Sequence, residues 1–379
     1  MVEYARKYPF LFILPSLIGG ILIGERFLFA PKLLTLITLL LIIISYYLYR
    51  NKKWELLVLS YPIITLYIDV LIYSTELGDN INIVLHENIQ NILSPIKQYF
   101  TEKNYKIIHN NEASALVNAI CLGEKSGMHY ATKTLFNECG IMHLVAVSGL
   151  HVGAIYMMIN KISNRKYLSL TFIWIYSLII GASPSAIRAS AILTYISIAE
   201  SFNKSYSSLN GILCCAFITL IFAPETIHSI SFQLSYGAYI GIITIFPLFV
   251  PPKKTKGKFI KYLISTIGVS VAAQVATLPI ILYYFNGISI NSYILNIVAI
   301  PMASLILYLD IFALITPIFL SRLIGYLLSF MGEGLIFVTK LMEPVNVFVG
   351  EVSIGYPTII LYYCGVGGVF YCIKLGIRN

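Results

Sequence analysis

Residues 289–320 read SINSYILNIVAIPMASLILYLDIFALITPIFL and contain a single charged side chain, Asp310. A helix must place about 20 predominantly apolar residues in the hydrocarbon core of a bilayer to cross it. This stretch of 32 residues is long enough, and Pro301 and Pro317 leave open a long tilted helix, a kinked helix or a broken pair. It therefore predicts that the fold is built in a membrane.

The rest of the chain has the same character. Hydrophobic residues make up 58% of the 379 residues, charged residues make up 11%, and the mean hydropathy is +0.81. Since a soluble domain carries roughly 25% charged residues, this composition excludes a fully water-facing surface. Four further runs contain no charge at all: 33–49, 167–182, 207–223 and 356–373. We therefore expect an all-α fold, a polytopic transmembrane helical bundle of about 10–12 spans.

The expected spans form two blocks separated by polar sequence. Residues 1–73 hold the N-terminal spans, and residues 139–379 hold the core. Between them, 74–111 reads as a short extracytoplasmic loop, and 112–138 reads as an amphipathic interfacial helix. The individual spans are predicted at 9–29, 31–49, 56–73, 140–160, 167–182, 184–202, 207–223, 230–250, 259–285, 289–320, 323–342 and 356–375.

The basic residues predict how the chain is oriented. The formal net charge is +9, and cytoplasmic loops of membrane proteins carry an excess of Lys and Arg. With the N-terminus in the cytoplasm, an alternating path places every basic cluster on that side. The clusters are Arg50, Lys52 and Lys53; Lys161, Arg165 and Lys166; Lys253, Lys254, Lys256, Lys258 and Lys261; and Lys374 with Arg378. The C-terminus is then cytoplasmic as well.

Polar residues inside apolar runs are the best candidates for function, because they are costly there and usually face protein or water. In the predicted span 140–160, His143, Ser148 and His151 fall on one half of a helix. They fit a lining for a cavity or a proton or anion site. The alternative is structural, since Gly149 and Gly153 form a small-residue packing motif.

A second candidate is the start of the predicted helix 184–202. Ser183 is a natural N-cap with Pro184 at the first helical position, and Arg188 follows one turn later. A free helix N-terminus and an arginine both suit phosphate. The alternative is an arginine that reaches to the interface, or one paired with Asp69 or Asp310.

Three further polar positions stand in later spans, at Gln233, Gln274 and Asn296. Gly237 and Gly241 form a second small-residue motif beside Gln233. For each of the three, hydrogen bonding between helices and lining of a pore are equally good interpretations.

Taken in order, these motifs resemble the ComEC competence family. The resemblance covers about residues 112–320 and is strong because several short blocks occur in the family's order. The blocks are HLVAVSGLHVG (143–153), SAIRA (185–189), FQLSY (232–236), Ala273-Gln274, Leu278-Pro279, Phe285-Asn286, Asn296 and Pro301.

The resemblance implies a channel that carries one DNA strand across the bacterial inner membrane in natural transformation. It implies a cytoplasmic DNA-translocating motor and an extracytoplasmic DNA-receptor protein as partners, membrane lipid as surroundings, and no enzymatic chemistry, cofactor or metal. The residues expected to line the substrate path are His143, Ser148, Gly149, His151, Gly153, Ser183, Ser185, Arg188, Gln233, Ser235, Gln274 and Asn296.

The sequence departs from the full-length family pattern in two places. The segment 74–111 is too short for the OB-like outer domain, with 81–85 as one strand remnant at most, and no metallo-β-lactamase-like domain follows the last span. A nuclease is then expected to be a separate polypeptide. Two other functions stay open: a transporter or channel for a small anion or lipid-linked molecule, and an intramembrane hydrolase using Ser148 and His151.

Overall fold

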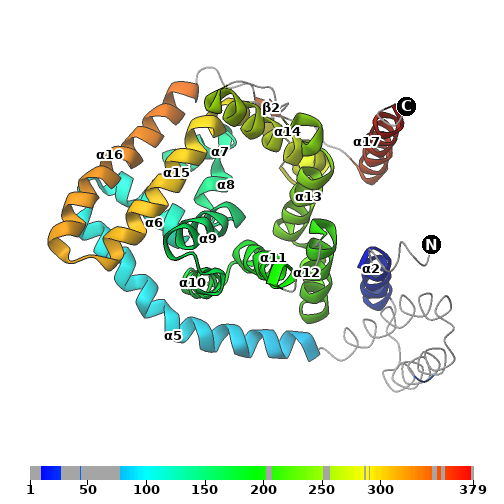
Figure 1. Ribbon diagram of the computed structural model, residues 1–379, viewed down its shortest axis with the longest axis horizontal. Coiled ribbons are helices and arrows are strands. Elements are labelled where there is room, and N and C mark those ends of the chain that lie inside the picture. Colours follow the sequence, from blue (N-terminus) through cyan, green and yellow to red (C-terminus); the bar gives the residue numbers. More distant parts are fainter. Residues whose placement is uncertain are drawn as a thin grey trace. The chain divides into compact units, whose positions relative to one another are not determined.

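The computed structural model of the protein describes residues 10–26, 43, 77–201, 207–250, 257–285, 287–289, 291–343, 348–350 and 355–376. Most of this part of the chain is helical, and it also includes two short strands and the turns between the helices (Figure 1). The prediction of an all-α fold is therefore confirmed. The spans predicted at 31–49 and 56–73 lie outside the described residues, apart from Ile43.

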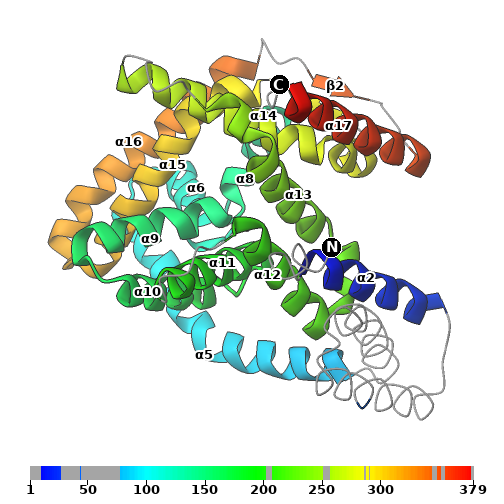
Figure 2. The same ribbon diagram turned by 45° about the vertical axis from the view of Figure 1, so that its right-hand side comes forward.

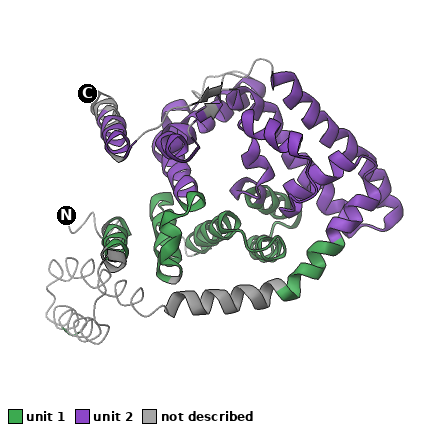
Figure 3. Ribbon diagram, turned by 180° about the vertical axis from the view of Figure 1, so that it is seen from behind, with its two compact units in different colours: residues 1–99, 152–232 green, residues 100–151, 233–379 purple. Residues whose placement is uncertain are grey.

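The chain divides into two compact units, which Figure 3 shows in different colours. Unit 1 comprises residues 1–99 and 152–232, and unit 2 comprises residues 100–151 and 233–379. Each unit is therefore built from segments that are far apart in the sequence. Three helices contribute residues to both units: α5 (Leu77–Ile107), α9 (Gly149–Ser163) and α13 (Ile230–Thr244).

Two hydrogen bonds join neighbouring apolar helices in unit 1. Its other elements are α2 (Phe10–Arg26), α10 (Lys166–Ile179), α11 (Pro184–Ser201), α12 (Ser208–Phe222) and the 3-10 turn η1 (Pro224–His228). The Trp174 indole donates to the Thr194 hydroxyl at 3.1 Å, and Ser177 and Ser190 share a hydrogen bond of 2.9 Å. Both bonds join α10 to α11, as expected where apolar packing alone does not distinguish a neighbouring helix from lipid.

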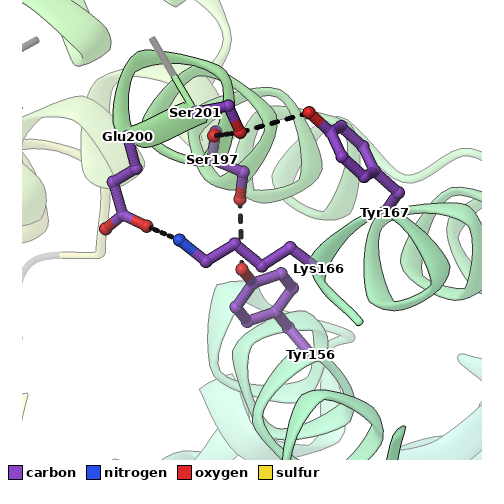
Figure 4. A network of polar contacts seen from close by, with 6 residues as sticks. All are labelled: Tyr156, Lys166, Tyr167, Ser197, Glu200 and Ser201. Carbon is purple, nitrogen blue, oxygen red and sulfur yellow. Dashed lines mark hydrogen bonds and ion pairs between the residues drawn. The ribbon is translucent and has the colours of Figure 1, made fainter. Parts of the chain in front are cut away.

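A second polar group ties α9, α10 and α11 together at one end. Figure 4 shows its members, which are Tyr156, Lys166, Tyr167, Ser197, Glu200 and Ser201. Lys166 and Glu200 form an ion pair whose side chains are 45% and 36% exposed. Because such exposed pairs contribute roughly 0–1 kcal/mol, this group positions the helix ends more than it stabilises them.

Unit 2 is built around a buried helix, α6 (Asn111–Leu122), which packs against α15 (Ser292–Ile315) and α16 (Ile318–Met342). Figures 1 and 2 both show α15 and α16 running side by side. The strands β1 (Gly287–Ser289) and β2 (Phe348–Gly350) pair antiparallel, with Ile288 opposite Val349. The remaining elements are α7 (Tyr130–Glu138), α8 (Met142–Val145), η2 (Phe246–Phe249), α14 (Lys258–Phe285) and α17 (Tyr356–Gly376).

Three of the described helices are long and apolar enough to cross a membrane: α14, α15 and α16. The stretch 289–320 proves to be a broken pair. Helix α15 continues through Pro301, while Pro317 is the residue before α16, which begins at Ile318. A proline at that place loses no intrahelical hydrogen bond, because the first N–H groups of a helix have no partner within it. The predicted total of ten to twelve spans stays a prediction.

The prediction of a loop at 74–111 with a strand remnant at 81–85 is wrong. Residues 77–107 form the single helix α5, which contains Pro95. The mostly apolar stretch from Ile81 to Leu85 covers only five positions, which is too short to distinguish a strand from part of a helix.

The prediction of one amphipathic interfacial helix over 112–138 is also wrong. The segment forms two helices, α6 and α7, which separate at Gly123, whose φ of 68° lies in the left-handed region. All residues from 113 to 122 are buried. A helix buried on every side is a core helix and has no face left to lie on a membrane surface.

Replacing Gly325 by alanine should destabilise unit 2 strongly. A Cβ at this position in α16 would lie 2.0 Å from the carbonyl oxygen of Ile107, a backbone atom that cannot rotate away. We expect a loss of about 3 kcal/mol in the free energy of unfolding, measured by thermal or denaturant unfolding in detergent.

Gly334 in the same helix supplies the matched control. A Cβ there would meet only the Met302 methyl carbon at 3.4 Å, which is ordinary contact. Gly334→Ala should therefore be neutral, or stabilising by about 0.5–1 kcal/mol through the better helix propensity of alanine. Equal effects of the two substitutions would contradict the close approach at Gly325.

Candidate functional site

A cavity of about 280 Å³ in unit 2 brings together two of the predicted path residues, His143 and Gln274. Helices α8, α13 and α14, strand β1 and the first turn of α15 all contribute to its wall. The lining residues are Asn137, Gly140, Met142, His143, Leu234, Gln274, Leu278, Ile281, Phe285, Gly287, Ser289 and Ser292. Residues from 137 to 292 thus meet at one place, which is the strongest candidate site in the described part of unit 2.

A chain of hydrogen bonds fixes the orientation of Gln274 in this cavity. The Ser292 hydroxyl donates to the carbonyl oxygen of Ser289 at 3.0 Å, so its oxygen must accept from the Gln274 amide nitrogen, 2.9 Å away. The amide oxygen Oε1 of Gln274 is then the acceptor that the side chain offers elsewhere. Gln274 therefore both fastens α14 to α15 and lines the cavity, so the two interpretations of this residue are compatible.

His143 lies on α8, a single helical turn, and its ring is held by the backbone. Nδ1 is 3.1 Å from the carbonyl oxygen of Gly140, which can only accept, so Nδ1 carries a proton. In the neutral ring, Nε2 is then a hydrogen-bond acceptor. Gly140 has a φ of +72°, and a Cβ there would lie 3.0 Å from Ser292 Cβ and 3.1 Å from Ser289 Cβ. Only glycine suits both this backbone conformation and this close approach.

The prediction of one continuous helix over 140–160 is wrong. The chain leaves helical geometry at Ala146, whose ψ is 123°, and α9 begins at Gly149. His143 and His151 therefore lie on different helices instead of on one face. The break is held by the His151 ring, whose Nδ1 accepts the Ser148 backbone N–H at 3.1 Å.

Ser148 and His151 do contact each other, with 3.2 Å between Ser148 Oγ and His151 Nδ1. The same Nδ1 also accepts the Ser148 backbone N–H, so the neutral ring carries its proton on Nε2. His151 is 0% exposed, and Nε2 has no hydrogen-bond partner among the described residues. This geometry makes His151 primarily a cap for the chain break, and it leaves Nε2–H as a buried donor.

The two glycines of the first motif do not behave as a packing pair. Gly149 is the exposed first residue of α9. At Gly153, a Cβ would meet no atom of the described chain within 4 Å. In the second motif, a Cβ at Gly241 would lie 2.4 Å from the carbonyl oxygen of Ala272, so α13 and α14 do approach closely there. The structural interpretation is therefore supported for Gly241 and not for Gly153.

In unit 1, the predicted helix start at Ser183 is confirmed. Helix α11 begins at Pro184, and the Ser183 hydroxyl oxygen accepts the Ala186 N–H at 3.4 Å. The chain reaches this point from α10 through a tight turn in which Gly181 has a φ of 97° and Ala182 a φ of 52°. Ser185, in the first turn of α11, is half-buried.

Arg188 is almost fully buried, with 6% of its surface exposed. Its Nη2 donates to the carbonyl oxygen of Ser231 at 2.9 Å and to the hydroxyl of the same residue at 3.2 Å. Arg188 thus braces α11 against the first turn of α13. The alternative of an arginine reaching into the interface does not fit this burial, and Asp69 lies outside the described residues.

The remaining predicted residues lie on α13 and α15. The Gln233 amide donates to the Tyr284 hydroxyl at 3.4 Å, which joins α13 to α14. Ser235 is half-buried on α13. Asn296, on α15, is 5% exposed, and its Oδ1 has no donor among the described residues. None of these three lines the cavity that holds His143.

Residues that the sequence interpretation missed complete the cavity wall, above all Ser289, Ser292 and Phe285. The available indications were the family block at Phe285 and, for Ser292, the polar pair that it forms with Asn291 at the start of an apolar run. A buried lysine elsewhere in unit 2 was missed as well: the Lys103 ammonium donates to the carbonyl oxygens of Leu314 and Thr316 at 2.9 and 3.0 Å.

About half of the chain is similar to proteins of Bacillus subtilis, Haemophilus influenzae and Escherichia coli. ComE operon protein 3 of Bacillus subtilis (strain 168) is 31% identical over 199 residues, which is 50% of this chain and 25% of that protein. Recombination protein 2 of Haemophilus influenzae is 23% identical over 223 residues, or 53% of this chain and 28% of that protein. The uncharacterized protein YcaI of Escherichia coli is 24% identical over 208 residues, with coverages of 51% and 28%.

The matched regions thus span about a quarter of the length of these relatives. No solved structure matches the chain. The model of the family described as "Competence protein" matches residues 120–376, which is well over half of the chain and includes the cavity, the chain break at Ser148 and the α11 start. The chain therefore belongs to the competence protein family.

Proposed function

We propose that the protein forms a conduit for single-stranded DNA across the bacterial inner membrane during natural transformation. Family membership carries this proposal, since the matched region holds the candidate membrane-spanning helices and nearly all of the polar positions discussed above. The names of two relatives, ComE operon protein 3 and Recombination protein 2, are in keeping with it. The protein would be multi-pass, with both termini in the cytoplasm.

The physical requirement of such a conduit is a lining that replaces water around a polyanion. Each phosphate carries a negative charge that hydrocarbon cannot solvate, so hydrogen-bond donors or cations must line the path. We assign this role to the polar residues predicted from sequence, with Arg188 and the α11 start as the groups that meet phosphate. Arginine suits this because it keeps its charge and donates through a planar fork.

The protein would act without a cofactor or metal and without enzymatic chemistry of its own. A motor on the cytoplasmic side would pull the strand, a receptor protein outside would deliver it, and a separate nuclease would remove the second strand. The geometry of Ser148 and His151 supports the proposal that the protein has no enzymatic chemistry of its own. The ring nitrogen that faces the hydroxyl also accepts a backbone N–H. A catalytic base normally comes with that nitrogen available.

The test is internalisation of labelled DNA by cells that lack the gene, with and without the wild-type gene supplied in trans. We expect DNA bound at the surface to remain unchanged, while the fraction protected from added nuclease falls to background and is restored by wild type. Unchanged internalisation in the deletion strain would contradict the proposal.

A second candidate is a transporter for a small anion or a lipid-linked molecule. The cavity of about 280 Å³ favours it, because it is close to the roughly 300–1,000 Å³ of small-ligand sites. Flux of small solutes into liposomes that contain the purified protein, together with normal DNA uptake in the deletion strain, would make this the better account.

A further inference from the structure

The wall of the unit 2 cavity contains no formal charge. Of its twelve residues, all described, none is Lys, Arg, Asp or Glu, and the polar groups are amides, hydroxyls and one imidazole. A phosphate placed here would lack the cation or the array of N–H donors that it requires. The cavity is therefore built for an uncharged polar group and not for the backbone of a nucleic acid.

The polar groups of the cavity are held in fixed orientations. Gln274 is oriented by Ser292 and presents Oε1, and His143 is oriented by Gly140 and presents Nε2 in its neutral form. The amide of Asn137, which is exposed at the end of α7, adds both a donor and an acceptor. Acceptors and donors of this kind match the edges of nucleobases, which carry ring nitrogens, carbonyls and amino groups.

The remaining wall is apolar and includes an aromatic ring. Leu234, Leu278 and Ile281 supply aliphatic surface, and Phe285, 55% exposed, stands at the end of α14. An aromatic side chain beside an apolar wall is the usual surface on which a base of single-stranded DNA stacks. The volume of about 280 Å³ is just below the roughly 300–1,000 Å³ of small-ligand sites. It therefore suits one ring system at a time.

From this combination we infer that the cavity is a nucleobase-binding subsite, in which one base of the strand stacks against Phe285 and donates an N–H to Gln274 Oε1 or His143 Nε2. The inference rests on the proposed function and adds to it a division of labour. Bases are received by the uncharged cavity of unit 2, while phosphates are met elsewhere. Because every base has an aromatic face, such a subsite accepts any sequence.

The experiment compares two probes on the purified full-length protein in lipid nanodiscs. One is a fluorescent oligothymidylate, and the other is an abasic oligonucleotide of the same length and charge. We expect wild type to bind the oligothymidylate about tenfold more tightly than the abasic strand. Phe285→Leu and Gln274→Leu should each reduce binding of the oligothymidylate several-fold and leave binding of the abasic strand unchanged.

Phe330→Leu is the matched control, because Phe330 is 77% exposed on α16 and lies outside the cavity. It should alter neither affinity. As a second measurement, an oligonucleotide that contains a photoreactive pyrimidine should cross-link to peptides carrying residues 137–143 or 274–292. Equal affinities of wild type for the two probes, or equal losses for both probes in the cavity variants, would overturn the inference.

The failure of this inference is distinguishable from failure of the proposed function. If cells require the protein for DNA internalisation but the two probes bind alike, the conduit stands and the base subsite is wrong. If thymidine alone competes at the cavity while the deletion strain takes up DNA normally, the cavity is a site for free nucleosides and the DNA subsite is overturned.

Discussion

Arg188→Ala is expected to lower DNA internalisation by roughly 100-fold, which corresponds to the ~3 kcal/mol at the upper end of hydrogen bonds to charged groups. The side chain is 6% exposed and bonds Ser231 through Nη2. Its loss would remove a cation from the proposed phosphate path and the brace between α11 and α13. Internalisation is measured as nuclease-protected label in cells, after the variant has been shown to reach the membrane in normal amount.

Two further substitutions separate the charge from the brace. Arg188→Lys keeps the charge and loses the planar fork, whereas Ser231→Ala removes the hydroxyl contact at 3.2 Å and keeps the carbonyl contact at 2.9 Å. If Arg188 meets phosphate, Arg188→Lys should retain part of the uptake and Ser231→Ala most of it. Full uptake in Arg188→Ala would refute the assignment, and equal losses in all three variants would reduce Arg188 to a brace.

Features that depend on neighbouring residues in the chain were predictable from the sequence. Ser183 followed by Pro184 predicted a helix start because a hydroxyl can accept the free N–H groups and proline needs none. The apolar runs predicted helices because backbone groups in a bilayer must be satisfied within one segment. Pro317 marks a boundary and Pro301 does not. The two prolines alone do not indicate which of them ends a helix.

Features that depend on a distant partner were not predictable. The two small-residue motifs have the same spacing, yet a Cβ at Gly241 would lie 2.4 Å from the carbonyl oxygen of Ala272, whereas a Cβ at Gly153 would meet no described atom within 4 Å. The break at Ala146 falls within an apolar run, and it is held by a histidine, which is not a usual capping residue. Likewise, Ser292 matters because α14 brings Gln274 to it.

The polar groups of the two units differ in charge. The polar residues of unit 1 include a buried cation and a capped helix start, which are features suited to an anion. The cavity of unit 2 has no formal charge in its wall. A single strand of DNA presents both kinds of surface, charged phosphates and neutral bases. Family membership carries the DNA proposal, and a lining that includes both kinds of group would be in keeping with it.

The second large effect concerns the stability of unit 2, where a buried lysine donates hydrogen bonds to carbonyl oxygens at the end of a candidate membrane helix. Lys103 is 9% exposed and donates to the carbonyl oxygens of Leu314 and Thr316 at the end of α15. Cations are favourable there because the helix dipole is negative at its C-terminus. Asp310 is 1% exposed, one turn earlier on the same helix, and its charge interacts with that of Lys103.

Asp310 is buried beside Asn104, Cys121 and Lys103. The Asn104 amide, the Cys121 thiol and the Lys103 ammonium all interact with its carboxyl group. Burial lowers the pKa of Lys103, and the Asp310 charge opposes that shift by raising it. Each residue therefore makes the charge of the other less costly to bury.

Lys103→Met should consequently cost about 1–3 kcal/mol in the free energy of unfolding, because it leaves two carbonyl oxygens without a donor and removes the cation near a buried acid. In the double variant Lys103→Met with Asp310→Asn, the uncompensated acid is gone, so we expect part of that loss to be recovered. The measurement is a double-mutant cycle. It compares the free energies of unfolding in detergent of wild type, the two single variants and the double variant. Strictly additive losses would mean that the two residues act independently, and the pair would then be two separate helix contacts.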